Sequence, residues 1–132
     1  AFQNGIGCID AERVTALWSI NVGGRQSLGA DQDYVFSGDA SDRLSARRRA
    51  NGESVWLSDK FQNRKLSGML AIGKVVVFGD YEGYVHFLDR NTGTPLLRLP
   101  TNGSQIVGVP VRAGNTLAVT TQDGSVYAFR PE

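Results

Sequence analysis

One short segment recurs along this chain at a nearly constant spacing. Residues 82–93 read EGYVHFLDRNTG, residues 123–130 read DGSVYAFR 41 positions later, and residues 41–52 lie 41 positions earlier. A further shift of 38 positions reaches residues 3–10. Several segments therefore agree on one period, which indicates that the chain is built from copies of a single unit. The part of each unit that precedes these segments keeps the same spacing, at residues 34–39, 75–80 and 116–121.

Each unit has the pattern of short β-strands separated by tight turns. In the best-preserved copy, Asn91-Thr92-Gly93 has the composition of a hairpin turn, because glycine adopts a positive φ at low steric cost. Both faces of the preceding strand are largely apolar, which is typical of a sheet buried between two neighbours. Four antiparallel strands in a period near 40 predict a β-propeller. The expected strands of this copy are Leu66–Ala71, Lys74–Gly79, Tyr84–Asp89 and Pro95–Leu99.

The number of expected strands is too small for a closed ring, since propellers usually have about 4–8 blades. We expect an all-β fold: a partial β-propeller of about three blades of four-stranded antiparallel sheets, which is a fragment of a larger ring. Open strand edges at both ends would favour association with a second copy. The expected segments are the end of one blade (1–24), two full blades (25–60 and 61–103) and a last blade without its fourth strand (104–132).

Composition and charge exclude several classes of protein. Fourteen Lys and Arg oppose thirteen Asp and Glu, so a net charge of +1 gives no field that would attract nucleic acid. The longest apolar runs have four residues, whereas a transmembrane helix needs about 20. Cys8 is the single cysteine, which excludes an internal disulfide and a multi-cysteine metal site.

Three copies of the unit carry a motif that identifies a superfamily. The segments starting at Cys8, Ala46 and Phe87 resemble the Ala-x-Asp-x-x-Thr-Gly-x-x-x-Trp motif of quinoprotein-like propellers. The resemblance implies that the Trp packs between adjacent blades while the Asp and Gly hold the turn. Arg48, Val14 and Leu97 depart from it, in place of an Asp, a Gly and a Trp. The docking residues expected on this basis are Trp18, Trp56, Leu97, Asp10, Asp89, Gly52 and Gly93.

Two longer segments, residues 76–86 and 122–129, resemble the last two repeats of the BamB family of outer-membrane protein assembly factors. The resemblance covers the whole chain and places it in the C-terminal third of such a protein, which implies that the partial propeller is a fragment of an eight-bladed ring. It implies a non-enzymatic scaffold of the β-barrel assembly (BAM) machinery that binds BamA and other BAM subunits and assists the insertion of outer-membrane proteins. It also implies a lipid-anchored protein at the periplasmic face of the Gram-negative outer membrane. No position matches the family's best-known BamA contacts, so partner-binding residues stay open.

The alternative is a fragment of a quinoprotein dehydrogenase, an enzyme that shares the docking motif. Such enzymes need a pyrroloquinoline quinone pocket, convergent acidic calcium ligands and a catalytic Asp. This stretch has one cysteine and no acidic cluster, and its motifs only build blades. We therefore expect no enzyme activity, no catalytic or metal-binding residue and no cofactor.

The remaining candidate residues have structural interpretations beside the chemical ones. Cys8 aligns with Ala46 and Phe87, which favours a buried thiol over a nucleophile. His86 lies inside a strand, which favours packing or a hydrogen bond over metal binding. The arginines at 47–49 favour a solvated corner over a docking site for an acidic partner. One Asp per repeat at the turns favours turn chemistry over calcium, which needs convergent oxygens; these are Asp39, Asp80 and Asp123.

Overall fold

The computed structural model describes residues 5–10, 15–21 and 27–130 of the 132-residue chain, and in these ranges it contains strands and no helix. The strands form four antiparallel sheets in which each strand pairs with its neighbour along the chain. We call these sheets blades 1 to 4. Blade 1 holds β1 (Gly5–Asp10) and β2 (Thr15–Asn21); blade 2 holds β3 (Ser27–Ala30), β4 (Tyr34–Gly38), β5 (Leu44–Arg48) and β6 (Ser54–Ser58); blade 3 holds β7 (Leu70–Ile72), β8 (Val75–Gly79), β9 (Tyr84–Asp89) and β10 (Pro95–Pro100); blade 4 holds β11 (Ile106–Ala113), β12 (Thr116–Thr121) and β13 (Val126–Phe129).

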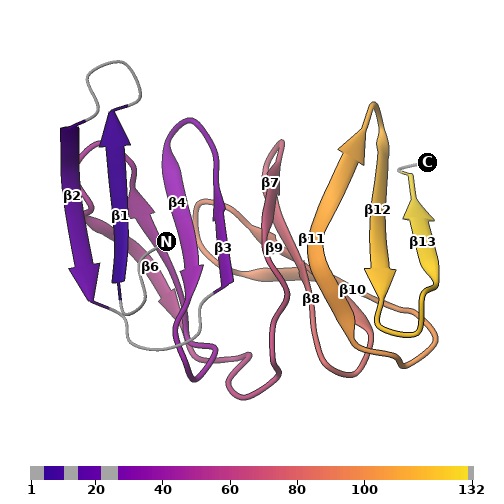
Figure 1. The fold of residues 1–132 in the computed structure, drawn as a ribbon. Coiled ribbons are helices and arrows are strands. Elements are labelled where there is room, and N and C mark those ends of the chain that lie inside the picture. Colours follow the sequence, from indigo (N-terminus) through magenta and orange to yellow (C-terminus); the bar gives the residue numbers. More distant parts are fainter. Residues whose placement is uncertain (1–4, 11–14, 22–26, 131–132) are drawn as a thin grey trace.

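The blades follow one another along an arc, in the order of the sequence (Figure 1). The segment just before β7 links blade 3 to the first strands of both neighbours: Met69 N donates to Leu28 O in β3 at 3.1 Å, and Gly68 N donates to Gly108 O in β11 at 3.0 Å. The predicted all-β, partial-propeller fold is confirmed. The four sheets fall within the four expected segments, whose boundaries stay a prediction.

The first strand of blade 3 differs from its prediction. The expected strand covered residues 66–71, but β7 begins at Leu70. The backbone N–H groups just before it are used elsewhere, since Gly68 and Met69 donate to the neighbouring blades. At these two residues, hydrogen bonds to neighbouring blades therefore replace pairing within the sheet, whereas Ser67 N still donates to Gly79 O of β8.

The apolar core lies in the spaces between blades. Phe36 and Phe78 are fully buried and belong to the cluster between blades 2 and 3. Burial of one such side chain contributes about 1.5–3 kcal/mol. The first cluster comprises Phe36, Leu44, Ala46, Trp56, Phe61, Leu66, Met69, Val76, Phe78 and Leu88. The second, between blades 3 and 4, comprises Val77, Val85, Ile106, Leu117 and Val119.

A β-bulge recurs in the fourth strand of the repeat. In blade 1 the register passes from Cys8↔Trp18 to Ile9↔Ala16, which leaves one extra residue before the tryptophan. Blades 2 and 3 show the same irregularity in β6 and β10. A bulge changes the direction in which the following side chains point. It stands immediately before each expected docking side chain, with Leu17, Val55 and Leu96 as the extra residues.

Candidate functional site

The contacts between successive blades bring together most of the residues that the motif singled out. Trp56, on β6 of blade 2, donates its indole N–H to the carbonyl oxygen of Arg90 in blade 3 at 2.9 Å. Its ring lies against Gly93, where an added Cβ would come within 2.6 Å of Trp56 Cε3. Gly93 also has a φ of +75°, which an L side chain rarely adopts. Glycine is therefore required at Gly93 both for the turn and for the close approach of the indole.

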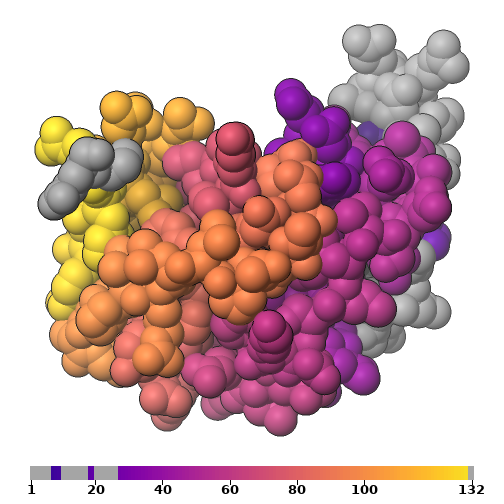
Figure 2. Space-filling model, turned by 180° about the vertical axis from the view of Figure 1, so that it is seen from behind, coloured from indigo at the N-terminus to yellow at the C-terminus, as the bar shows by residue number. Residues whose placement is uncertain are grey.

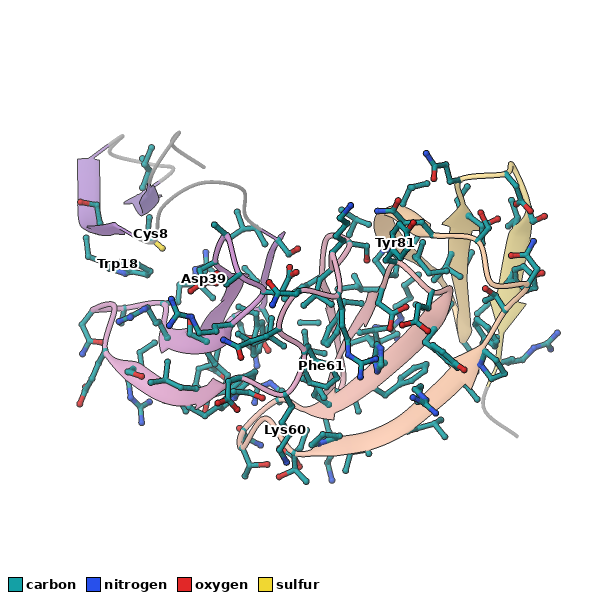
Figure 3. The ribbon with its side chains drawn as sticks, turned by 90° about the horizontal axis from the view of Figure 1, so that it is seen from below. Cys8, Trp18, Asp39, Lys60, Phe61 and Tyr81 are labelled. Atoms are coloured by element: carbon teal, nitrogen blue, oxygen red, sulfur yellow. The ribbon has the colours of Figure 1, made fainter. Side chains whose placement is uncertain are left out.

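Trp18 makes the same contact one blade earlier. Its indole N–H donates to Arg49 O at 2.7 Å, and its ring lies against Gly52, whose added Cβ would be 2.9 Å from Trp18 Cδ2. Gly52 has a φ of +76°. Figure 3 shows Trp18 reaching from blade 1 toward blade 2. The structure thus places both tryptophans on the third-to-fourth-strand turn of the next blade, and their energetic role stays a prediction.

The two turns that receive the tryptophans are held in different ways. In blade 3, Asp89 Oδ1 accepts hydrogen bonds from the backbone N–H groups of Asn91 (2.8 Å) and Thr92 (3.2 Å). In blade 2, Arg48 occupies the Asp position. The turn glycine nevertheless donates its backbone N–H to the carbonyl oxygen of the residue four positions earlier in both blades. This hydrogen bond is 2.8 Å long from Gly52 to Arg48 and from Gly93 to Asp89. The backbone therefore keeps this turn without the carboxylate.

Leu97 and Asp10 stand apart from these pairs. Leu97 is 51% exposed, and it lines a mainly apolar cavity of about 420 Å³ between blades 3 and 4. The repeat places the turn that would receive it beyond Arg130, outside the described residues. Asp10 ends β1, where its backbone pairs with Thr15, and its side chain lies outside the described part of the chain.

Sequence reasoning missed an ion-pair cluster beside the Trp56 contact. Arg90 Nε donates to Asp31 Oδ2 at 2.7 Å, its Nη2 donates to Asp33 Oδ2 at 2.9 Å, and its guanidinium lies 4.5 Å from the ring centre of Tyr34. Burial raises the pKa of Asp31, but the hydrogen bond from Arg90 and two backbone N–H groups outweigh it and hold that pKa below the usual value. The hydrogen bond to Asp31 is also the main cause that raises the pKa of Arg90. Nearly sixty positions separate the partners, so no local pattern could have revealed them.

His86 is buried and hydrogen-bonded in blade 3. Its Nε2 lies 2.7 Å from Asp80 Oδ2, and its ring stacks on Phe78 with 5.3 Å between ring centres. The other oxygen of Asp80 accepts the N–H groups of Glu82 and Tyr84, which closes the turn. Burial raises the pKa of Asp80, but the hydrogen bond from His86 and the turn N–H groups outweigh it and lower that pKa.

The corresponding positions of blade 2 are polar. Ser37 and Ser45 are hydrogen-bonded to each other at 3.0 Å where blade 3 has Phe78 and His86. Arg47 Nη1 donates to Gly52 O at 3.0 Å, but its buried Nε has no partner in the described part of the chain. These side chains lie on the face of blade 2 that points away from blade 3. They help to line a cavity of about 580 Å³.

The other turn aspartates and Cys8 take structural positions. Asp39 accepts the N–H groups of Ser41 and Arg43, and Asp123 accepts the Thr121 hydroxyl. Cys8 is half-buried, and burial raises the pKa of its thiol although the charge of Arg49 partly opposes this. Within the described ranges, no three His, Cys, Asp or Glu side chains are grouped so that they could hold a metal ion. No described segment is a helix that could cross a membrane.

Comparison with known proteins confirms the resemblance that the motifs indicated. The family model described as outer membrane protein assembly factor BamB matches residues 1–58. A protein of Burkholderia pseudomallei with that name is 44% identical over 130 residues, which cover 98% of this chain and 34% of the relative. The chain therefore spans about a third of the length of this curated relative.

Solved structures show the same fold. BamB from Moraxella catarrhalis matches 96% of this chain and 38% of its own with a TM-score of 0.84 and 22% identity. A quinohemoprotein alcohol dehydrogenase from Pseudomonas putida matches 76% of this chain and 18% of its own with a TM-score of 0.64 and 15% identity. At these identities the likeness concerns the fold alone.

Proposed function

We infer that this chain is a segment of an outer-membrane protein assembly factor of the BamB family and that it builds consecutive blades of that protein's propeller. The observation that carries this inference is the 44% identity to a BamB that extends over 98% of the chain. The recurring contact of a tryptophan with the turn of the next blade supports a rigid scaffold. Such a scaffold presents loops and strand edges to partners.

The proposed role is that of a non-enzymatic subunit of the BAM machinery. The whole protein would bind BamA and other BAM subunits and assist the folding and insertion of outer-membrane proteins. It would act at the periplasmic face of the outer membrane of a Gram-negative cell, held there by an N-terminal lipid anchor. In this role the described residues form the packed interfaces between blades and a surface that partners can contact. The role needs no cofactor.

Co-purification tests this proposal. The full-length protein that contains this chain would be tagged and isolated from membranes in mild detergent, beside an unrelated periplasmic lipoprotein as the control. We expect BamA and further BAM subunits to be retained by the first and absent from the second. Repeating the isolation with the 132-residue chain alone shows whether this segment itself contributes to binding. Full-length protein that retains no BAM subunit would contradict the proposal.

The quinoprotein alternative has its own test. The full-length protein would be mixed with pyrroloquinoline quinone and calcium, and its absorbance spectrum and dye-linked alcohol oxidation would be recorded. We expect neither a bound-cofactor band nor activity. Both together would replace the scaffold role with that of a dehydrogenase.

We further propose that the 132-residue chain, produced alone, associates with a second copy. β13 pairs only with β12 in the described part of the chain, and Val126 on it is 68% exposed. An uncovered strand edge is a template for pairing with another chain. Sedimentation velocity at high protein concentration should show a dimer or a larger species. A strict monomer would overturn this.

A further inference from the structure

A positively charged groove lies beside β10, on the outer side of blade 3. It has a volume of about 350 Å³. Its walls carry three basic side chains and no acidic one, in a chain whose net charge is only +1. Figure 2 shows β10 and the loop after it, in orange, crossing this face at the surface. The residues that line the groove are Lys60, Phe61, Arg64, His86, Leu88, Pro95, Leu96, Leu97 and Arg98.

Two of the three basic side chains are not neutralised by an acidic side chain in the described part of the chain. Within the described residues, Lys60 and Arg98 form no ion pair. Arg98 packs its guanidinium over the Tyr84 ring, 4.2 Å from the ring centre, so its charge stays at the groove. Arg64 lies 3.7 Å from the buried Asp80, whose carboxylate also binds His86. Two of the three cations are thus free to meet acidic groups of a partner.

The apolar part of the groove is exposed at the bulge in β10. Leu96 is the extra residue there and is 56% exposed, whereas Val55 at the same place in blade 2 packs against the core. Phe61 lies farther inside, while Lys60 lies close to β10 (Figure 3). One face therefore presents an apolar surface flanked by positive charge, a combination that suits a partner with one apolar and several acidic side chains.

The shape of the groove decides how such a partner would bind. Prolines at both ends of β10, Pro95 and Pro100, remove N–H donors and so discourage addition of a further strand at this edge. The volume is at the lower end of the range of ligand pockets, about 300–1,000 Å³. It suits a short segment that inserts one side chain rather than a flat membrane surface.

We propose that this groove binds an acidic, extended segment of a protein partner, which inserts an apolar side chain beside Leu96 and places carboxylates at Lys60 and Arg98. This goes beyond the role as a BAM subunit and does not require BamA to be the partner. Attraction between the charges would make binding weaker at high salt.

Fluorescence anisotropy with a labelled probe tests the proposal. The probe is a short peptide of glutamates around one central phenylalanine, and the control peptides carry lysines in place of the glutamates or glycine in place of the phenylalanine. We expect the folded chain to bind the first peptide at least fivefold more tightly than either control. Binding of all three alike, or of none up to millimolar protein, would overturn the proposal.

Matched variants locate the binding. K60E and K74E change the net charge equally and both alter exposed lysines, but Lys74 lies in the β7–β8 turn away from the groove. We expect K60E and L96S each to weaken the affinity for the peptide at least fivefold. K74E should leave this affinity within twofold of that of the unaltered chain. Equal losses for K60E and K74E would show general charge attraction and contradict the groove. Circular dichroism confirms that each variant is folded.

Phosphatidylglycerol vesicles test whether the groove binds an anionic lipid surface instead of a peptide. Co-sedimentation with them should be negligible, and K60E should not change it. Vesicle binding that K60E abolishes, without any peptide binding, would assign the groove to a lipid surface and overturn the proposal. BamA retention by the full-length protein is measured separately, so failure of the peptide does not count against the role of the whole protein.

Discussion

The two described sides of blade 2 both contact a neighbouring blade, but one side is apolar and the other is polar. Toward blade 3 it presents Phe36, Ala46 and Trp56, which belong to a buried apolar core with Phe61 and Phe78. The opposite side presents Ser37, Ser45 and Arg47 beside a cavity of about 580 Å³. Both interfaces nevertheless keep the contact of a tryptophan with the turn of the next blade. A recurring docking contact therefore tolerates very different packing around it.

The largest effect is expected from W56A. It removes a buried ring from the apolar interface between blades 2 and 3 together with the hydrogen bond to Arg90, and Trp-to-Ala changes in cores cost about 3–5 kcal/mol. Urea unfolding of the 132-residue chain measures this loss. L57A changes the next residue of β6, which is 72% exposed, and should cost no more than about 0.5 kcal/mol. Equal losses for the two variants would contradict the docking role.

G93A should have the next largest effect. Alanine there needs a positive φ, which costs about 1–2 kcal/mol, and its Cβ also collides with the Trp56 ring. G114A is the control, since Gly114 also has a positive φ but has no atom within 4 Å of an added Cβ. We expect G93A to lower the free energy of unfolding by about 1–3 kcal/mol more than G114A. If the two losses are the same, the close approach of the indole is unimportant.

D80N tests the buried carboxylate of Asp80, which is hydrogen-bonded to His86. The lowered pKa of Asp80 means that its ionised form stabilises the fold above the unfolded pKa, about 3.9, and that this contribution is lost as pH falls through the folded pKa. At pH 7 we expect D80N to lower the free energy of unfolding by about 1.5–3 kcal/mol, which is the usual contribution of a hydrogen bond to a charged group. The difference between D80N and the unaltered chain should shrink below pH 4. A constant difference from pH 7 to pH 2.5 would show that the charge is irrelevant.

The smallest effect, and the only gain, is expected from R47L. Leucine is the residue that the repeat has at this place in blade 3, Leu88, and it removes the buried Nε that has no partner. An unsatisfied buried polar group costs about 1–3 kcal/mol. R47L also removes the hydrogen bond to Gly52 O, so we expect the free energy of unfolding to rise by only about 0.5–1 kcal/mol. R48L, at an exposed neighbour, should change nothing measurable. A loss of stability in R47L would mean that the cavity needs the charge.

Much of the fold could be predicted from the sequence because the same strand and turn pattern recurs in each copy of the repeat. The period, the turn glycines and the two-sided apolar strands predicted the sheets, and the motif pointed to the tryptophans and glycines that are in contact. The segment at residues 66–69 differs from the predicted strand, because Gly68 and Met69 donate their backbone N–H groups to neighbouring blades. The cluster of Arg90 with Asp31 and Asp33 could not be foreseen, because it joins charges from different repeats that share no local pattern.

The groove beside β10 shows where sequence reasoning ends. The single run of arginines, residues 47–49, attracted the hypothesis of an acidic partner, yet the basic side chains that share one groove come from three separated positions. Lys60, Arg64 and Arg98 are brought together only by the fold. No charge pattern along the chain would have selected them.

Hydrogen exchange of the two indole N–H groups, followed by NMR on the folded chain, tests the central claim most directly. If each tryptophan donates to the turn of the next blade, both signals should exchange far more slowly than that of a free indole, and the buried Trp56 more slowly than Trp18, which is only partly buried. Exchange of both at the rate of an exposed tryptophan would show that the blades are not joined in this way.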